Sequence, residues 1–270
     1  MQRVIWQYWE KGEIEPLFVD ELHQIAKKNS GVQVIQVTPN TLDQYLPNLP
    51  SEVLEIKELA HKADMIRTRL LYQYGGMWLD SDAIVLKDLN EFFDLLDSYE
   101  FISFNNNASF SDRPLKVRIN AFLSRPGSQV LKDWIYEQNL KLPKKQFAWT
   151  EVGTDLLDPI VLRNQKTVKL LNFDLVCPVK WNEVERFSKE DSAAEQILND
   201  SYVVMLSNKA AQMLNAKIVQ MSLDDLAKEQ TLLAAIIKAA RRDRQKNCKS
   251  NRLHFLRKWF GFNKKIDKKR

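Results

Sequence analysis

The chain has 270 residues, of which 44% are hydrophobic, so it can bury a sizeable core and is not a disordered polymer. Its formal net charge of +5 is divided unevenly, because residues 238–270 carry a net charge of +12 and residues 1–237 a net charge of −7. No Gly/Ser-rich linker or internal repeat interrupts the chain, which favours one domain over residues 1–237 followed by a basic tail.

Cys177 and Cys248 are the only cysteines, and neither lies at metal-ligand spacing from another cysteine or a histidine. This pattern indicates neither a disulfide framework nor a structural zinc site. The N-terminus lacks the features of a secretory signal, and no stretch reaches about 18 consecutive apolar residues. We therefore expect a cytoplasmic protein that does not span a membrane.

The first elements predict a βαβ unit. An apolar, β-prone stretch at 4–6 is followed by helical spacing over 14–29 and by a second strand at 32–37. Such a unit indicates a parallel sheet with helices on its faces.

A longer helix is predicted next. One apolar stripe runs over 51–74 until Gly75 and Gly76 stop the helix, and MWLDSDAIVL at 77–86 then has the pattern of a strand. Further along we expect a short helix at 91–99, strands at 101–104 and 117–124, helices at 126–140 and within 147–164, strands at 168–179 and 200–208, and a helix at 223–242.

Asp80 and Asp82 lie one residue apart inside the strand at 77–86. Residues i and i+2 of a strand face the same side, so the two carboxylates could share one divalent cation, or hold one cation and one sugar hydroxyl. Asp80 also follows apolar residues where the carboxyl end of a parallel strand, the usual ligand position, should lie. The alternative is that the strand stops at Leu79 and both aspartates are solvated loop or cap residues.

Asp64 and Arg67 lie on one flank of the preceding helix, three residues apart. An arginine near a sheet is costly to bury unless it meets an anion or a carboxylate, and a metal-bridged diphosphate would supply that partner. The alternative is an ion pair on a wet helix surface, which contributes only a few tenths of a kcal/mol.

The segment HKADMIRTRLLYQYGGMWLDSDAIVLKDL, residues 61–89, closely resembles the signature of a DXD-motif glycosyltransferase family. This family includes capsular polysaccharide glycosyltransferases and yeast-type initiating mannosyltransferases, and it is distantly similar to the large clostridial glucosylating toxins. An Asp-x-x-Arg on a helix, a Tyr-Gly-Gly turn, an aromatic residue and Leu-Asp-x-Asp match in order. VIWQYWE and VRINAFLSRPGSQVLKDWI extend the resemblance over roughly the first 140 residues.

The resemblance implies a GT-A fold, a Rossmann-like α/β/α sandwich with a mixed, mainly parallel sheet. It implies transfer of a sugar, with retention, from a nucleotide-diphosphate sugar, UDP-sugar favoured, to a glycan or lipid-linked oligosaccharide acceptor, as in bacterial capsular or exopolysaccharide synthesis. The implied cofactor is Mn²⁺ or Mg²⁺, because a cation between the phosphates stabilises the leaving group.

By the same resemblance, Asp80, Asp82 and Arg67 form the catalytic set. Asp82 would bind the cation, while Asp80 would contact the ribose or donor sugar and could reach the metal through water. Asp64 and Arg67 would hold the donor hydroxyls and the diphosphate. Trp6 would lie near the nucleobase, although an aromatic residue beside a first strand more often packs in the core.

Weaker candidates lie downstream. Asn120 and Asn105 could line the donor pocket, although a turn or edge role would explain either residue. Asp155 lies where relatives have an active-site turn, but helix N-capping by Thr154 or Asp155 is the more economical explanation. The sequence names no nucleophile, so covalent and front-side mechanisms both stay open.

The sequence departs from the family near the end of the domain. Met205 stands where many relatives have a histidine, and a thioether is a poor ligand for Mn²⁺ or Mg²⁺. Ser207 or Asn208 could supply an oxygen instead, or could form a polar turn after the strand. The alternative function is therefore a catalytically degenerate GT-A domain that binds a sugar nucleotide or a glycan as a scaffold subunit.

The tail at 238–270 mixes cations with aromatic residues. It could lie at an anionic membrane surface, at the inner face of the cell membrane, gaining on the order of 1 kcal/mol per basic residue. It could instead cover the core of the acidic domain, or be solvated. Charge without a recognisable nucleic-acid-binding fold does not indicate nucleic acid binding.

Overall fold

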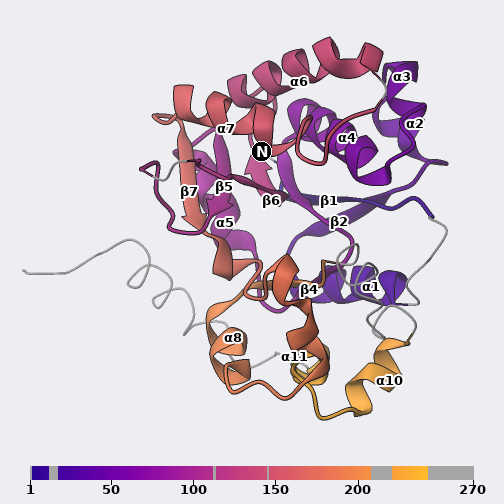
Figure 1. The fold of residues 1–270 in the computed structure, drawn as a ribbon, viewed down its shortest axis with the longest axis vertical. Helices are drawn as coiled ribbons and strands as arrows, with labels where there is room; N and C mark the ends of the chain where they lie inside the picture. Colours follow the sequence, from indigo (N-terminus) through magenta and orange to yellow (C-terminus); the bar gives the residue numbers. More distant parts are fainter. Residues whose placement is uncertain (1, 12–17, 112–113, 145, 208–220, 243–270) are drawn as a thin grey trace, which may run out of the picture. The chain divides into compact units, whose positions relative to one another are not determined.

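The centre of the fold is a six-stranded sheet with strand order β2-β1-β3-β6-β5-β7. The computed structural model describes residues 2–11, 18–111, 114–144, 146–207 and 221–242 (Figure 1). The strands are β1 (Val4–Tyr8), β2 (Gln33–Val37), β3 (Gly76–Leu79), β5 (Phe101–Asn105), β6 (Arg118–Ser124) and β7 (Val168–Asn172). Both neighbours of β6 pair with it in antiparallel register, whereas the other pairings are parallel.

Helices cover both faces of this sheet (Figure 1). The helices α4 (Leu59–Tyr74), α6 (Gln129–Lys141) and α7 (Thr154–Arg163) lie on one side, and α1 (Val19–Asn29) lies on the other. The shorter helices are α2 (Leu42–Tyr45), α3 (Ser51–Leu54), α5 (Asn90–Asp94), α8 (Ala194–Asp200), α10 (Leu223–Lys228) and α11 (Leu232–Arg241), with 3₁₀ turns η1 (Leu95–Asp97), η2 (Leu142–Lys144), η3 (Phe173–Leu175) and η4 (Trp181–Ser188). The expected α/β/α sandwich with a mixed, mainly parallel sheet is confirmed.

The first strand shows how the sequence fills the core on the α4 side. Val4, Trp6 and Tyr8 alternate along β1 and join the same buried cluster as Trp78 of β3 and Trp134 of α6. Each large side chain buried in this way contributes about 2–3 kcal/mol by removing apolar surface from water.

The helix expected over 51–74 is two helices, so this prediction was wrong in its details. The helix α3 ends at Leu54, and α4 begins at Leu59 after Glu58 takes an extended conformation with φ −74° and ψ 111°. Ile56 lies between them and is buried, with 2% exposed. Because Val53 and Ile56 keep the helical spacing of buried residues through the break, periodicity did not reveal it.

The single strand expected over 77–86 is also wrong, and the alternative in which the strand stops at Leu79 gives the correct end. The strand β3 ends at Leu79, residues 80–82 form a turn, and β4 (Ala83–Val85) leaves the main sheet to pair in antiparallel register with β8 (Val203–Met205). Asp80 and Asp82 therefore flank a turn and do not share one face of a strand. Because both strands are buried throughout, the sequence had no alternation that could mark the break.

The C-terminal part of the domain differs from expectation in one further element. The helix expected over 223–242 is divided into α10 and α11, because Glu229 takes an extended conformation with ψ 167°. Residues 1–240 form one compact unit and residues 241–270 a second. Within the part of the chain that the structure describes, no helix is long and apolar enough to cross a membrane.

Candidate functional site

Arg67 is buried on α4 and contacts two carboxylates. Its Nη2 lies 3.3 Å from Asp64 Oδ1 and 3.4 Å from Asp80 Oδ1. Its Nη1 donates to the Ile119 carbonyl at 2.6 Å, and its Nε donates to the Ala63 carbonyl at 3.2 Å. Arg67 therefore links α4, the turn after β3 and strand β6 in one cluster.

The Asp64 carboxylate is buried beside Arg67. Only 7% of its side chain is exposed, so the expected alternative of an ion pair on a wet surface is wrong. A Cβ added at Gly153 would lie 3.0 Å from Asp64 Oδ2, which shows how closely the loop before α7 approaches it. Burial raises the pKa of Asp64 to about 6, opposed by the nearby charge of Arg67.

Asp80 occupies the carboxyl end of β3, where a ligand was expected. Its Oδ1 accepts from the Trp78 indole at 2.7 Å, and its main-chain N–H donates to the Asn120 carbonyl at 3.0 Å. The guanidinium of Arg67 lies 4.8 Å from the centre of the Trp78 ring. Burial raises the pKa of Asp80, while Arg67 and the indole hydrogen bond oppose that rise. These contacts hold the carboxylate in one orientation.

The turn at 80–82 is fixed to the neighbouring strand and ribbon. The Ser81 hydroxyl donates to the Tyr8 carbonyl at the end of β1 at 3.0 Å, so the carboxyl ends of β1 and β3 meet here. The Leu206 N–H donates to the Asp82 carbonyl at 3.0 Å. This bond continues the β4–β8 pairing and brings the chain leading to Ser207 beside Asp82.

The downstream candidates can be located only in part. Met205 is buried in β8, with 1% exposed, so its thioether contributes to packing. Ser207 has a positive φ of 52°, a conformation typical of a turn that redirects the chain. Asn208 lies outside the described residues. The same is true of nearly all of the basic tail and of Cys248.

Strand β6 carries two polar side chains near its start, of which Asn120 lies beside Asp80. Arg118 and Asn120 lie two residues apart and therefore on the same face of the strand. Arg118 Nε and Asn120 Oδ1 are buried and have no hydrogen-bond partner among the described residues. The Arg118 guanidinium lies 4.6 Å from the centre of the Phe173 ring. Unmet buried polar atoms of this kind suit a polar ligand.

Arg118 was not predicted from the sequence. The segment VRINAFLS places it two residues before Asn120, and this period-two relation was the available signal. Burial lowers the pKa of Arg118, although Asp158 is among the nearby groups that oppose the shift.

Trp6 and Asn105 do not join this cluster. The Trp6 indole packs against Tyr45 and Tyr74, donates to the Gly75 carbonyl at 2.9 Å and is 3% exposed, a core position. Asn105 accepts from the Ser109 N–H and donates to its carbonyl, which closes a turn after β5. Trp6 therefore has the core-packing role, and Asn105 the turn role, that the sequence analysis gave as alternatives to ligand binding.

The expected N-cap at Thr154 or Asp155 is wrong. The helix α7 has Gly153 as its N-cap residue and no side-chain capping hydrogen bond. The Thr154 hydroxyl donates instead to the Val117 carbonyl at 3.2 Å, and Asp155 accepts from the Thr150 hydroxyl at 2.8 Å. Gly153 is used here because a side chain would collide with Ile119 and Asp64.

The oxygen groups around the turn fit a hard divalent cation. No group of three His, Cys, Asp or Glu side chains able to hold a metal occurs within the described ranges. Mg²⁺ and similar cations are commonly held by one or two carboxylates together with substrate phosphates and water, so a larger protein cage is not required. Asp80, Asp82 and the Ser207 hydroxyl have the appropriate chemistry.

The chain is similar to proteins of capsular polysaccharide synthesis and to glycosyltransferases. The family model described as "Capsular polysaccharide synthesis protein" matches residues 1–135. O-glycosyltransferase PaGT of Phomopsis amygdali is 28% identical over 154 residues, covering 49% of this chain and 37% of that protein. Glycosyltransferase afumC of Aspergillus fumigatus is 26% identical over 153 residues, covering 49% and 38%. The solved PaToxG glycosyltransferase has a TM-score of 0.48 at 11% identity, covering 89% of this chain and 86% of that one.

The matched region contains the cluster described above. Asp64, Arg67, Asp80 and Asp82 all lie within residues 1–135, whereas Ser207 lies beyond them. The chain spans less than two fifths of the length of the two sequence relatives.

Proposed function

The chain belongs to the family described as capsular polysaccharide synthesis protein, and we propose that it is a glycosyltransferase. It transfers a sugar from a nucleotide-diphosphate sugar, with a UDP-sugar as the favoured donor. The configuration at the anomeric carbon is retained. The acceptor is a glycan or a lipid-linked oligosaccharide in capsular or exopolysaccharide synthesis. The observation that carries this proposal is the contact of the buried Arg67 guanidinium with the buried Asp64 and with the partly exposed Asp80 at the carboxyl end of β3.

Arg67 suits a diphosphate because its position is fixed before a ligand arrives. Its Nη1 and Nε are held by main-chain carbonyls, while Nη2 faces the two carboxylates. A guanidinium held in this way binds an anionic oxygen without losing further side-chain entropy. Asp64, beside it, can accept hydrogen bonds from the hydroxyls of the donor sugar.

Arg118 and Asn120 support the same assignment from the other side of the site. Their unmet Nε and Oδ1 atoms offer one donor and one acceptor on the face of β6 next to Asp80. A nucleotide sugar presents both phosphate acceptors and hydroxyl donors, so it can satisfy the two groups together.

Asp82, Asp80, Ser207 and Asn208 are the residues proposed to hold Mn²⁺ or Mg²⁺. When bound, the cation supplies electrostatic stabilisation of the charge that develops on the leaving diphosphate. The residues of the chain orient the donor: Arg67 holds the diphosphate, and Asp64 and Asp80 hold sugar or ribose hydroxyls. The buried position of Arg67 and Asp64 keeps water away from these contacts.

The test is donor binding and slow donor hydrolysis by the purified chain, measured with a panel of UDP- and GDP-sugars in Mn²⁺. Asp82→Ala should lower metal-dependent donor binding by at least about tenfold. Asp97→Ala is the matched control, since Asp97 is an exposed aspartate of η1, and it should change neither binding nor hydrolysis. If no donor is bound or hydrolysed and Asp82→Ala changes nothing, the proposal fails.

One result would select the alternative function. If a nucleotide sugar or a glycan binds but is neither hydrolysed nor transferred, the chain is a binding or scaffold subunit with a degenerate GT-A domain. The buried thioether of Met205, where relatives have a histidine, is the observation that keeps this alternative in the test.

The proposal also includes a location, since a lipid-linked acceptor would be reached at the inner face of the cell membrane. The tail at 238–270, with its net charge of +12, is proposed to contact anionic lipid there. Co-sedimentation with vesicles containing phosphatidylglycerol, compared with neutral vesicles, tests this: a chain ending at residue 242 should lose the binding.

A further inference from the structure

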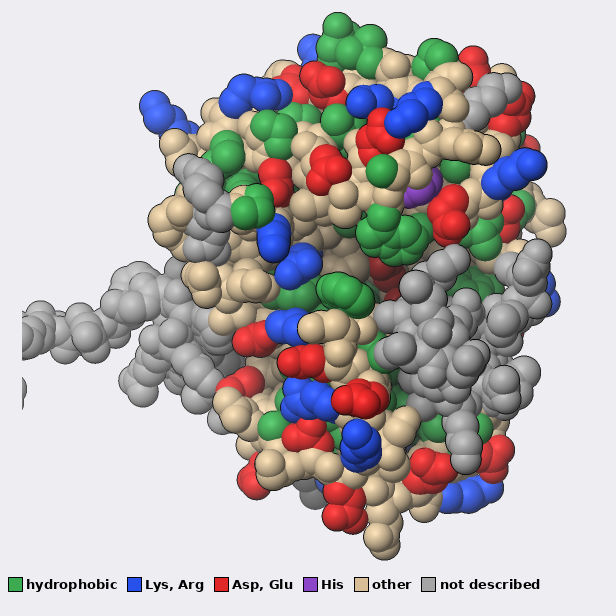
Figure 2. Space-filling model, viewed as in Figure 1, with side chains coloured by type: hydrophobic (Ala, Val, Ile, Leu, Met, Phe, Trp, Pro, Cys, Tyr) green, Lys and Arg blue, Asp and Glu red, His purple; other side chains and the backbone are tan. Residues whose placement is uncertain are grey.

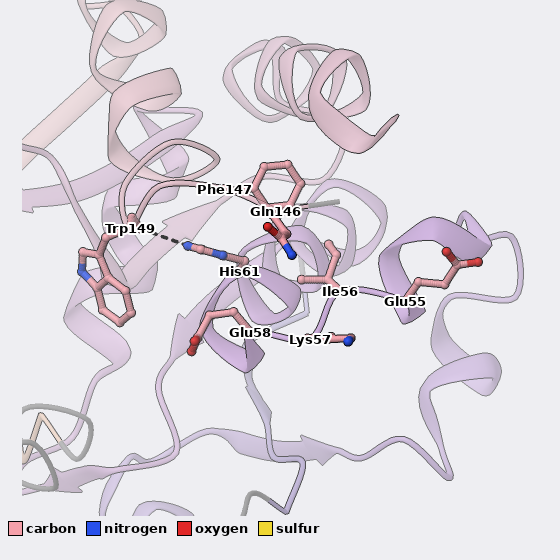
Figure 3. A pocket seen from close by; sticks show the side chains of 8 residues that line it. All are labelled: Glu55, Ile56, Lys57, Glu58, His61, Gln146, Phe147 and Trp149. Carbon is pink, nitrogen blue, oxygen red and sulfur yellow. Dashed lines mark hydrogen bonds between the residues drawn. The ribbon is translucent and has the colours of Figure 1, made fainter. Parts of the chain in front are cut away.

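A second concave site lies between the chain that joins α3 to α4 and the loop before α7. This pocket, of about 790 Å³, is lined by Glu55, Ile56, Lys57, Glu58, His61, Gln146, Phe147 and Trp149. Figure 3 shows the Trp149 indole and the Glu58 side chain extending on the same side of His61, with Glu55 at the far end of the row. The size is within the range of pockets that hold small ligands.

Trp149 is exposed although the loop that carries it is anchored. The residue is 60% exposed, yet its carbonyl lies 3.3 Å from His61 Nε2. Glu151 fixes the same loop, because its carboxylate accepts from Lys144 Nζ at 2.6 and 2.7 Å and from the Ala148 N–H at 2.9 Å. An indole presented to solvent from a fixed main chain is a ready surface for stacking.

The pocket lies near the Asp64 and Arg67 cluster along α4, although neither of these residues lines it. His61 and Asp64 are three residues apart on α4 and so lie on the same flank of the helix. The loop that carries Trp149 continues to Gly153, whose added Cβ would lie 3.0 Å from Asp64 Oδ2. The helix and the loop that line the pocket therefore both extend to the position of Asp64, the group proposed to hold the donor sugar.

The lining favours a neutral, hydroxyl-rich ligand. An exposed indole can cover the apolar C–H face of a sugar ring, and carboxylates accept hydrogen bonds from its hydroxyls. The lining contains two glutamates, Glu55 and Glu58, and one lysine, Lys57. This negative balance disfavours a nucleotide or another phosphate-bearing ligand. On the face in Figure 2, acidic and basic side chains are interspersed among hydrophobic ones.

We infer that the Trp149 pocket binds a neutral sugar residue of the glycan acceptor. Trp149 stacks on the sugar ring and Glu58 accepts hydrogen bonds from its hydroxyls. The acceptor role rests on the proposed function, because only a transferase has an acceptor, whereas the binding of a neutral glycan does not. Because α4 and the loop of Trp149 both extend from the pocket to Asp64, the same two elements would hold the glycan and the donor sugar.

The test is direct binding of neutral oligosaccharides, which does not depend on turnover. An array of manno-, gluco- and N-acetylglucosamine oligosaccharides is probed with the full chain and with Trp149→Ala, Glu58→Gln and Trp181→Ala. Trp181 is the matched control, since it is 66% exposed on η4 and does not line the pocket. We expect Trp149→Ala to weaken binding at least about tenfold, Glu58→Gln to weaken it several-fold and Trp181→Ala to leave it within about twofold.

Three results would overturn the inference. They are that no oligosaccharide on the array binds the full chain, that binding survives Trp149→Ala, or that Trp149→Ala weakens binding of UDP and GDP while glycan binding is unchanged. The last result would assign the pocket to the nucleobase. Thermal unfolding of each variant separates loss of the pocket from loss of the fold. Failure of the proposed function has a different signature, namely absent donor binding with intact, Trp149-dependent glycan binding.

Discussion

The guanidinium of Arg67 lies 3.4 Å from the carboxylate of Asp80, so helix α4 and the end of strand β3 meet through charge. The glycine pair between the two elements makes this possible. Gly76 has a φ of +104°, and a Cβ there would lie 2.5 Å from the Val4 carbonyl. A glycine is therefore required at residue 76 for the chain to reverse tightly against β1 and return Asp80 toward the helix.

Replacing Arg67 with methionine should destabilise the fold. The substitution leaves Asp64 and Asp80 without their cation, which we expect to lower the free energy of unfolding by about 3–5 kcal/mol at pH 7.5. Urea unfolding measures this value. At pH 5 the loss should be smaller, because protonated carboxyls no longer need the guanidinium.

Arg69→Met is the matched control for that experiment. Arg69 is also buried on α4, but among the described residues it donates to neutral atoms: the carbonyl oxygen and the sulfur of Met65 and the side-chain oxygens of Gln138 and Asn139. Its loss should destabilise the chain by a similar amount at both pH values. An Arg67→Met cost that does not change between pH 7.5 and pH 5 would contradict the role assigned to the two carboxylates.

Asp64 should make stability depend on pH. Its pKa is raised to about 6 in the folded chain from an ordinary value of 3.8, so the folded state binds the proton more tightly than the unfolded state does. The contribution of this group is present at low pH and is lost as the pH rises through 6. Between pH 4 and pH 7 the loss is on the order of 3 kcal/mol.

Comparison with Asp64→Asn isolates this contribution, because other titrating groups, Asp80 included, are present in both chains. We expect the unfolding free energy of Asp64→Asn, relative to the unchanged chain, to rise by on the order of 2–3 kcal/mol from pH 4 to pH 7. Urea titrations at four pH values measure it. If the difference in unfolding free energy between the two chains did not change with pH, the pKa of Asp64 would not be raised by burial.

The sequence revealed the site better than it revealed the elements that build it. Helical spacing alone paired Asp64 with Arg67, and the glycine pair marked the end of α4. The break at Leu54 was missed and the break at Leu79 was given only as an alternative, for one physical reason. Ile56 and the residues of β4 are buried, so the apolar pattern continued across changes in backbone direction.

Tertiary relationships account for the remaining differences. The sequence position of Trp6 is compatible with a core residue and with a ligand contact. The packing of Tyr45 and Tyr74 against its ring shows that it lies in the core. Arg118 was missed because a cation at the start of a strand ordinarily faces solvent. Its burial beside Phe173 depends on η3, the 3₁₀ turn after β7, which is remote in sequence.

Asn120 should be more important for ligand binding than for stability. Its Oδ1 is buried without a partner among the described residues, so Asn120→Ala removes an unmet acceptor. Asparagine and alanine are both poor strand formers, so propensity changes little. We expect the free energy of unfolding to stay within about 1 kcal/mol or to rise, while donor affinity falls about tenfold. Urea unfolding and calorimetric titration with UDP-sugars test the two halves, and a destabilised variant with unchanged affinity would contradict the role proposed for Asn120.

Gly153 should be intolerant of a side chain for a reason that reaches the site. A Cβ there would lie 2.7 Å from Ile119 Cδ1 and 3.0 Å from Asp64 Oδ2, so Gly153→Ala must displace the carboxylate or the loop. We expect a loss of about 1–3 kcal/mol in unfolding free energy together with weaker donor binding.

Gly127→Ala provides the control for Gly153→Ala. A Cβ at Gly127 would meet nothing within 4 Å, but the residue has a φ of +69°, so the substitution costs about 1 kcal/mol through backbone strain alone. Both variants should therefore lose stability in urea, while only Gly153→Ala should lose donor affinity in calorimetry. Equal donor affinity in the two variants would show that the approach of the α7 loop to Asp64 is a packing feature without consequence for the ligand.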